Sequence, residues 1–142
     1  MILHVFCDGG ARGNPGPSAI GVVVQDDAGA LLQTLSKPIG IATNNVAEYT
    51  AVKESLTLIN EFSQPIESVE YFLDSLLVVN QLNGTFKIKN SALQEYYRVI
   101  MAQLDALHIP VRFNHVLREK NSAADKLVNA ALDTGKTEQN SY

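Results

Sequence analysis

The chain has 142 residues, 46% of them hydrophobic and 18% charged, and a formal net charge of −4. The length suits a single domain, and the composition excludes a largely disordered chain. The negative charge provides no overall basic footprint for a nucleic acid, although net charge is a poor guide if several of the acids hold metal ions.

The cysteine content and the hydropathy bear on where the protein acts. Cys7 is the only cysteine, so an internal disulfide is impossible, which suits a reducing compartment. The N-terminal residues carry no basic leader, and no stretch reaches the ~20 apolar residues of a membrane span. We therefore expect a cytoplasmic, monomeric protein that does not contact a membrane.

The first half of the chain predicts a run of strands and then a helix. Apolar, β-prone segments lie at 2–8, 19–25 and 30–36. The first segment breaks at Gly9-Gly10, and the turn at 26–29 joins the other two as a hairpin. Residues 43–62 then show the apolar spacing of a helix.

The second half predicts alternating strands and helices. Strands are expected at 66–74 and 111–117, and helices at 75–82, 91–107 and 122–132. Helical crossovers favour parallel pairing of these two strands. The expected fold is α/β, with a five-stranded mixed sheet of three antiparallel strands and then parallel strands, flanked by helices. The polar residues 134–142 are expected to form a disordered tail.

Four acidic residues stand in separate, distinctive segments. Asp8 and Asp74 end predicted strands, and Glu48 and Asp125 lie one turn into predicted helices. In such sheets, ligands gather at the carboxyl ends of strands. Carboxylate oxygens suit Mg²⁺ or Mn²⁺, and two such ions catalyse in-line phosphoryl displacement. The pattern therefore indicates a site for two divalent ions with bound substrate. Mg²⁺ is the expected ion and Mn²⁺ a possible substitute, but the pattern does not decide which ion is preferred.

Each acid also has a plainer explanation when it is taken alone. An aspartate such as Asp8 often opens a turn, and Glu48 suits a solvated first helical turn. Asp125 follows Ser122 by three residues, which is a capping arrangement. Asp74 is harder to explain in this way because it directly ends an apolar run.

Four segments, in this order, resemble the motifs of type 1 ribonuclease H. They are residues 8–17, 43–48, 74–79 and 121–125. The resemblance covers about residues 1–132 and identifies 1–133 as a ribonuclease H-like catalytic domain. It implies endonucleolytic hydrolysis of the RNA strand of RNA–DNA hybrids, with 5′-phosphate and 3′-hydroxyl products.

The resemblance also implies roles for individual residues. Asp8, Glu48, Asp74 and Asp125 would be the catalytic metal ligands. Contacts to the nucleic acid would come from Gly9, Gly10, Arg12, Asn14, Thr43, Asn44, Asn45, Ser75, Lys87 and Lys89. Glycine allows the backbone to approach a ligand closely. Thr43 and the following asparagines also suit plain helix capping, and the two roles are compatible.

The sequence departs from the family in three places. Leu76 stands where a polar residue is frequent, so one hydrogen bond to substrate would be missing. The loop before the last helix lacks the histidine that many members carry, and His115 is assigned to the preceding strand. Arg118 therefore becomes the catalytic candidate near the leaving phosphate. Its plainer alternative is a solvated cation. We also expect a short form without the basic protrusion or a separate hybrid-binding domain.

Two other functions stay open at this point. The first is a related nuclease that also cuts double-stranded RNA. The second is a nucleic-acid-binding module of the same fold that has lost catalysis, and the presence of all four acids argues against it.

Overall fold

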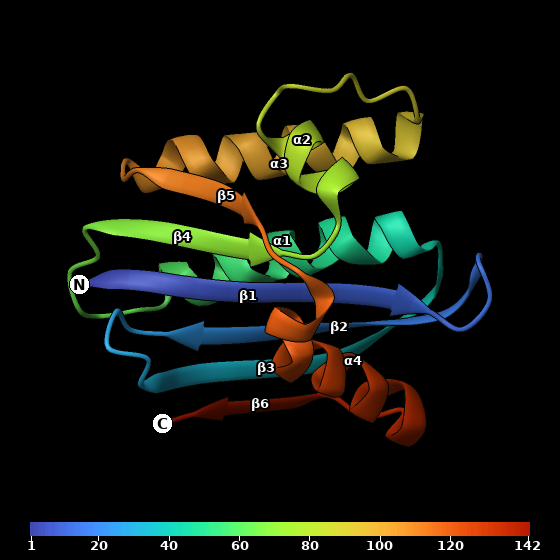
Figure 1. Cartoon of the computed structure of the whole chain (residues 1–142), viewed down its shortest axis with the longest axis horizontal. Coiled ribbons are helices and arrows are strands. Elements are labelled where there is room, and N and C mark those ends of the chain that lie inside the picture. The colour runs from blue at the N-terminus through green and yellow to red at the C-terminus, as the bar shows by residue number, and fades with distance from the viewer.

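The computed structural model describes residues 1–142 and contains one mixed sheet of six strands, in the order β5-β4-β1-β2-β3-β6 (Figure 1). The α/β class is as predicted, but the expected count of five strands is wrong. The strands are β1 (Ile2–Ala11), β2 (Gly16–Gln25), β3 (Leu31–Ala42), β4 (Ser68–Leu73), β5 (Val111–His115) and β6 (Glu138–Ser141). The first three pair antiparallel, and β4 pairs parallel with both β1 and β5.

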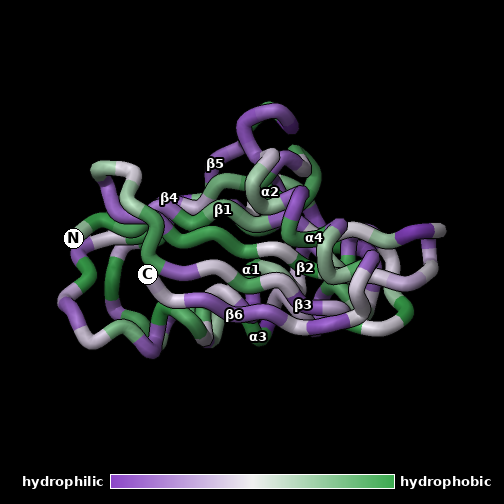
Figure 2. The backbone as a smooth tube through the Cα atoms, turned by 90° about the horizontal axis from the view of Figure 1, so that it is seen from below, coloured by the Kyte–Doolittle hydropathy of each residue, from purple (hydrophilic) through white to green (hydrophobic).

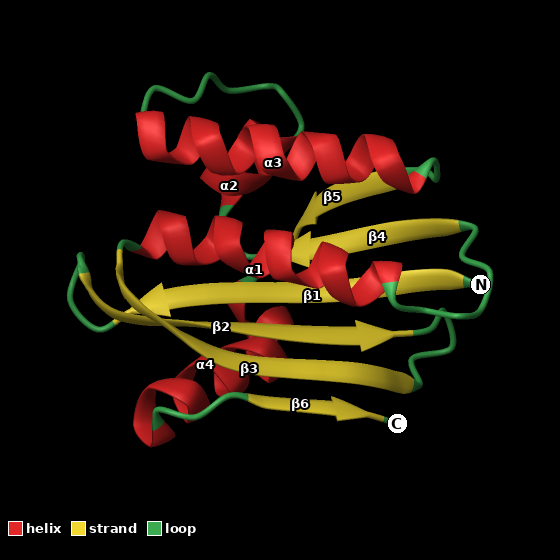
Figure 3. Ribbon diagram, turned by 180° about the vertical axis from the view of Figure 1, so that it is seen from behind, coloured by secondary structure: helices red, strands yellow, loops and turns green.

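Helices cover the two faces of the sheet unequally. They are α1 (Asn44–Asn60), α2 (Leu76–Leu82), α3 (Ser91–Leu107), the 3-10 turn η1 (Arg118–Asn121) and α4 (Ser122–Thr134). Figure 3 shows α1 and α3 in front of the sheet, with α4 crossing behind it. No helix is both long enough and apolar enough to span a bilayer.

The core lies between the central strands and the α1–α3 layer. Leu3, Val5 and Cys7 alternate along β1, point to that layer and are fully buried. Tyr71 on β4 belongs to the same cluster, and its hydroxyl lies 2.6 Å from the hydroxyl of Ser55 on α1. The next strand residue after Cys7, Asp8, therefore points to the opposite face.

β1 continues through the glycines where the sequence predicted its end. Its pairing with β4 stops at Phe6–Phe72, whereas its pairing with β2 extends to Ala11. Asp8 therefore lies inside a strand rather than at its end, opposite Gly21 of β2. The antiparallel neighbour supplies the ladder that carries β1 past Gly9-Gly10.

The polar C-terminal segment is not a disordered tail. Glu138–Ser141 pair antiparallel with residues 33–36 of β3 as β6. All four residues of β6 are exposed, and Figure 2 shows the strand as largely hydrophilic. The prediction failed because the outer edge of β3 offers backbone hydrogen bonds, which need no apolar side chains. The boundary at 133 therefore does not separate a folded part from an unfolded one.

Candidate active site

Three carboxylates meet where β4 ends and β1 continues. Asp8, Glu48 and Asp74 each offer an oxygen, and these atoms all lie within 4.8 Å of one another. Asp8 comes from β1, Glu48 from the second turn of α1, and Asp74 from the residue directly after β4. Asp8 is 8% and Glu48 6% exposed, so both charges are largely removed from water.

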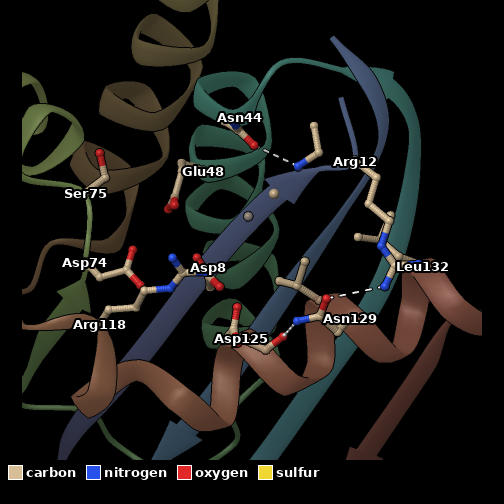
Figure 4. A pocket seen from close by; sticks show the side chains of 14 residues that line it. Asp8, Arg12, Asn44, Glu48, Asp74, Ser75, Arg118, Asp125, Asn129 and Leu132 are labelled. Carbon is tan, nitrogen blue, oxygen red and sulfur yellow. Dashed lines mark hydrogen bonds between the residues drawn. The ribbon is translucent and has the colours of Figure 1, made fainter. Parts of the chain in front are cut away.

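The fourth predicted acid lies beside this group rather than in it. Asp125 projects from the first turn of α4 and lines the same pocket as the three carboxylates (Figure 4). Its charge contributes to raising the pKa of Asp8. The pocket has a volume of about 460 Å³. The structure therefore gathers four acids from four distant segments at one cavity.

Two glycines allow the helices to bring their acids to β1. A Cβ atom on Gly9 would stand 2.2 Å from the carbonyl carbon of Ala47, the residue before Glu48. A Cβ atom on Gly21 would stand 2.2 Å from the carbonyl oxygen of Ala124, the residue before Asp125. Both distances are far below van der Waals contact. Gly9 lines the pocket, but its missing side chain makes room for α1 rather than for a ligand.

Asn121 fixes the start of α4 against β1. Its Nδ2 donates to the carbonyl oxygen of Cys7 at 2.9 Å, and the residue is fully buried. The capping arrangement predicted for Ser122 and Asp125 does not form, because Asn121 occupies the N-cap and makes no side-chain cap bond. The motif signalled Asn121 in the sequence, but this structural role was missed. The bond sets the position of Asp125 relative to Asp8.

Burial and mutual repulsion make the acids hard to ionise together. Burial, followed by the charge of Asp74, raises the pKa of Asp8 to about 7. The pKa of Glu48 is raised well above its usual value by burial and then by the charges of Asp8 and Asp74. The Oε2 atom of Glu48 is buried and has no hydrogen-bond partner. An unpartnered oxygen in a group of hard donors fits a divalent cation.

The glycine-rich loop is tied to the start of α1 through asparagine side chains. Asn44 Oδ1 accepts from the Ala11 amide at 2.8 Å, and Asn14 Oδ1 accepts from the Asn44 amide at 3.0 Å. Because each oxygen faces a backbone N–H, each side-chain NH₂ group keeps its donors. Thr43 forms the N-cap of α1 and accepts from the Val46 amide at 3.2 Å.

Most of the other predicted site residues also surround this pocket. Gly10, Arg12, Asn44, Ser75 and Arg118 line it, and Figure 4 shows the Arg118 side chain directed between Asp74 and Asp8. Ser75 also caps α2, because its hydroxyl accepts from the Val78 amide at 3.3 Å. Asn14, Thr43 and Asn45 lie near the pocket but do not line it. His115 is exposed at the end of β5, outside the pocket.

The two predicted lysines lie elsewhere. Lys87 lines a separate, shallow depression of about 630 Å³ together with Phe86, Tyr97 and Arg98. Lys89 is exposed nearby in the same loop but does not line the depression. Part of the pocket wall was not predicted from the sequence, namely Val128, Asn129 and Leu132 of α4. The four-residue spacing between Asp125 and Asn129 could have identified Asn129, because residues four apart lie on the same face of a helix.

Comparisons with known proteins match most of the chain to one family of proteins. A family model described as "Reverse transcriptase-like" matches residues 6–131. The chain is 37% identical over 131 residues to ribonuclease HI of Halobacterium salinarum, covering 92% of this chain and 64% of that protein. It is 38% identical over 135 residues to a bifunctional protein of Mycobacterium tuberculosis, covering 94% of this chain but 36% of that protein. The chain thus spans about a third of the length of the first curated relatives that it matches.

A solved structure resembles the chain over most of its length. An RNase H1 isolated from compost is 42% identical, with a TM-score of 0.89, and the match covers 94% of this chain and 96% of that one. The same RNase H1 has been solved in complex with an RNA/DNA hybrid; that structure matches with a TM-score of 0.91 and 41% identity, over 94% of this chain and 98% of that one.

Proposed function

Because the chain belongs to the type 1 ribonuclease H family, we propose that it is a metal-dependent endonuclease that hydrolyses the RNA strand of RNA–DNA hybrids. The observation that carries the proposal is the meeting of Asp8, Glu48 and Asp74 in a pocket that Asp125 also lines. The products would carry 5′-phosphate and 3′-hydroxyl ends. The enzyme would act as a cytoplasmic monomer, and the unpaired, buried thiol of Cys7 suits a reducing compartment.

The four acids would hold two Mg²⁺ ions, with Mn²⁺ as a substitute. Ions bound in such a site supply an activated water and stabilise the charge on the leaving 3′ oxygen. The protein's part is to fix the ligands in advance. Asn121 and Gly21 hold Asp125 against β1, and Gly9 brings Glu48 beside Asp8. The carboxylates position the reacting groups and do not attack them.

Recognition of the RNA strand would rest on the asparagines at the pocket edge. The 2′-hydroxyl group distinguishes RNA from DNA, and its oxygen accepts hydrogen bonds. Asn14 and Asn44 present fixed NH₂ donors because their oxygens are bound to backbone amides. Asn45 and Ser75 would add contacts on either side. Leu76, which is 55% exposed, provides no polar group to this surface.

Arg118 is expected to contribute to turnover more than to binding. Its side chain enters the pocket, and no carboxylate oxygen lies within 4.0 Å of it, so its charge is available to a leaving phosphate. Arg118→Ala should lower kcat and change KM little, measured by steady-state cleavage of a labelled hybrid. His115→Ala is the matched control. Loss of catalysis in a well-folded His115→Ala protein would contradict this assignment.

Lys87 and Lys89 are expected to contact phosphates outside the active site. Lys87 lines a depression that Arg98 and two aromatic residues share, which suits a nucleic-acid backbone. Changing both lysines to alanine should weaken hybrid binding and reduce the log–log salt slope by roughly one unit per lost phosphate contact. Binding titrations over a range of salt concentrations measure this slope. A slope equal to that of the wild type, at matched stability, would count against the contact.

A substrate panel tests the proposed function directly. Labelled RNA–DNA hybrid, duplex RNA and duplex DNA are each incubated with Mg²⁺, Mn²⁺ or a chelator. Cleavage of the hybrid's RNA strand with metal, and none with chelator, is the expected result. Equal cleavage of duplex RNA would indicate the broader nuclease, and binding without cleavage under every condition would indicate a catalytically weak module.

A further inference from the structure

An ion pair at the far end of the pocket has no part in the proposed chemistry. Arg12 Nη2 lies 2.7 Å from Asp133 Oδ1 and 3.4 Å from Asn129 Oδ1. Arg12 and Asn129 both line the active-site pocket, and Figure 4 shows the bond between them. The guanidinium therefore lies in the cavity but is bound to α4.

The ion pair lies farther along α4 from the carboxylates. Asp125, Asn129 and Asp133 follow at intervals of four residues, so they share one side of the helix. At 1.5 Å per residue, Asp133 stands about 12 Å along the axis from Asp125. Successive phosphates of a strand are spaced by ~3.4 Å of helix axis. A strand that binds its scissile phosphate at the carboxylates and runs along α4 would bring further phosphates near Arg12, which lines the same pocket.

The ion pair is poorly suited to stabilising the fold. The side chains of Arg12 and Asp133 are 50% and 64% exposed, and exposed pairs contribute little to stability. A guanidinium presents a planar fork of donors that matches a phosphate as well as a carboxylate. The Asp133 carboxylate therefore binds the guanidinium of Arg12, which a phosphate in the same place would otherwise bind.

We propose that Asp133 is a positioning residue that holds Arg12 against α4 and competes with a substrate phosphate for its guanidinium. The proposal rests on the proposed function, because the competing phosphate belongs to the hybrid. Binding exchanges the carboxylate of Asp133 for a phosphate, so Asp133 lowers the affinity of the protein for its substrate.

Fluorescence anisotropy with labelled hybrid and Mg²⁺ measures this exchange. All proteins carry Asp74→Asn, so that the RNA strand stays intact. Asp133→Asn should tighten binding about two- to fivefold, which corresponds to losing an exposed ion pair, and steepen the salt slope by up to about one unit. Asp27→Asn is the matched control, because this exposed acid follows β2 at the end remote from Arg12. It removes the same charge and should leave Kd unchanged.

Arg12→Ala separates the proposed exchange from a general effect of charge. Arg12→Ala alone should weaken binding of the hybrid. In a protein that already carries Arg12→Ala, adding Asp133→Asn should no longer tighten binding. Equal tightening with and without Arg12, or an Asp133→Asn protein that binds like Asp27→Asn, would overturn the inference while the proposed function stands. A wild-type protein that neither binds nor cleaves the hybrid would overturn the proposed function and this inference with it.

Discussion

Asp74→Asn is expected to lower the rate of hybrid cleavage by several orders of magnitude with little effect on the fold. Asparagine keeps the shape of the side chain but removes one of the three carboxyl groups whose oxygens lie within 4.8 Å of one another. In the proposed mechanism these carboxylates hold the catalytic ions, so the loss of one should remove transition-state stabilisation rather than substrate affinity alone. The Asp74 side chain forms no hydrogen bond or salt bridge in the structure, so its replacement leaves the packing intact.

Initial rates on a labelled hybrid, together with circular dichroism, measure the two parts of this prediction. Asp105→Asn is a suitable control because Asp105 is exposed on α3, far from the carboxylates in the fold. It should cleave at the rate of the wild type. Full activity of Asp74→Asn, or cleavage by the wild type in excess chelator, would exclude the metal-dependent mechanism.

Elements with strong local signals were predicted well from the sequence. The boundaries of α3 match the predicted 91–107, because Asn90 caps the helix and an apolar stripe repeats along it. The start of α1 was likewise signalled by Thr43. β6 was missed because its stability comes from the backbone edge of β3, which no local pattern in 138–141 reveals. The same reason explains why β1 extends beyond its predicted end.

The candidate site shows a similar division between residue identity and residue role. The motifs pointed to the acids, to Asn44 and to Asn121, but not to what the two asparagines bind. Asn44 joins the loop 33 positions earlier, and Asn121 joins Cys7 across 114 positions. Contacts of this separation depend on the assembled sheet, so spacing along the chain does not predict them. Gly9 shows the same limit, because its role depends on the approach of α1.

In the absence of metal, Asp8→Asn is expected to raise the melting temperature. Folding raises the pKa of Asp8 from 3.8 to about 7, chiefly through burial and then through the charge of Asp74. Near pH 8 the Asp8 carboxylate is ionised in both states, and its charge is less favourable in the native state than in the unfolded chain. Asparagine carries no charge and so removes this free-energy cost of folding. Relief of even ~1 kcal/mol would raise Tm by about 4 °C in a chain of this size. Thermal melts in chelator measure the difference.

The stability of the metal-free protein should fall as the pH rises. Between about pH 4 and 7 the native state keeps a proton on Asp8 that the unfolded chain has lost, so stability falls as the pH rises. Glu48 acts in the same direction because its pKa is also raised. The Tm of the metal-free wild type should therefore decline across this window. Asp8→Asn should decline less steeply, and parallel curves would show that Asp8 is not the titrating group.

Metal should reverse the destabilisation in the wild type and fail to do so in the variant. A cation that binds only the native state stabilises it by mass action, so Mg²⁺ or Mn²⁺ should raise the Tm of the wild type. Asp8→Asn loses the central carboxylate and should lose most of that gain, whereas Asp105→Asn should respond like the wild type. Four unrelated surface acids would instead give little response to metal and a near-neutral substitution. An Asp8→Asn protein that is less stable than the wild type in chelator would contradict this account. Removing one of several charges that repel one another should stabilise the metal-free protein.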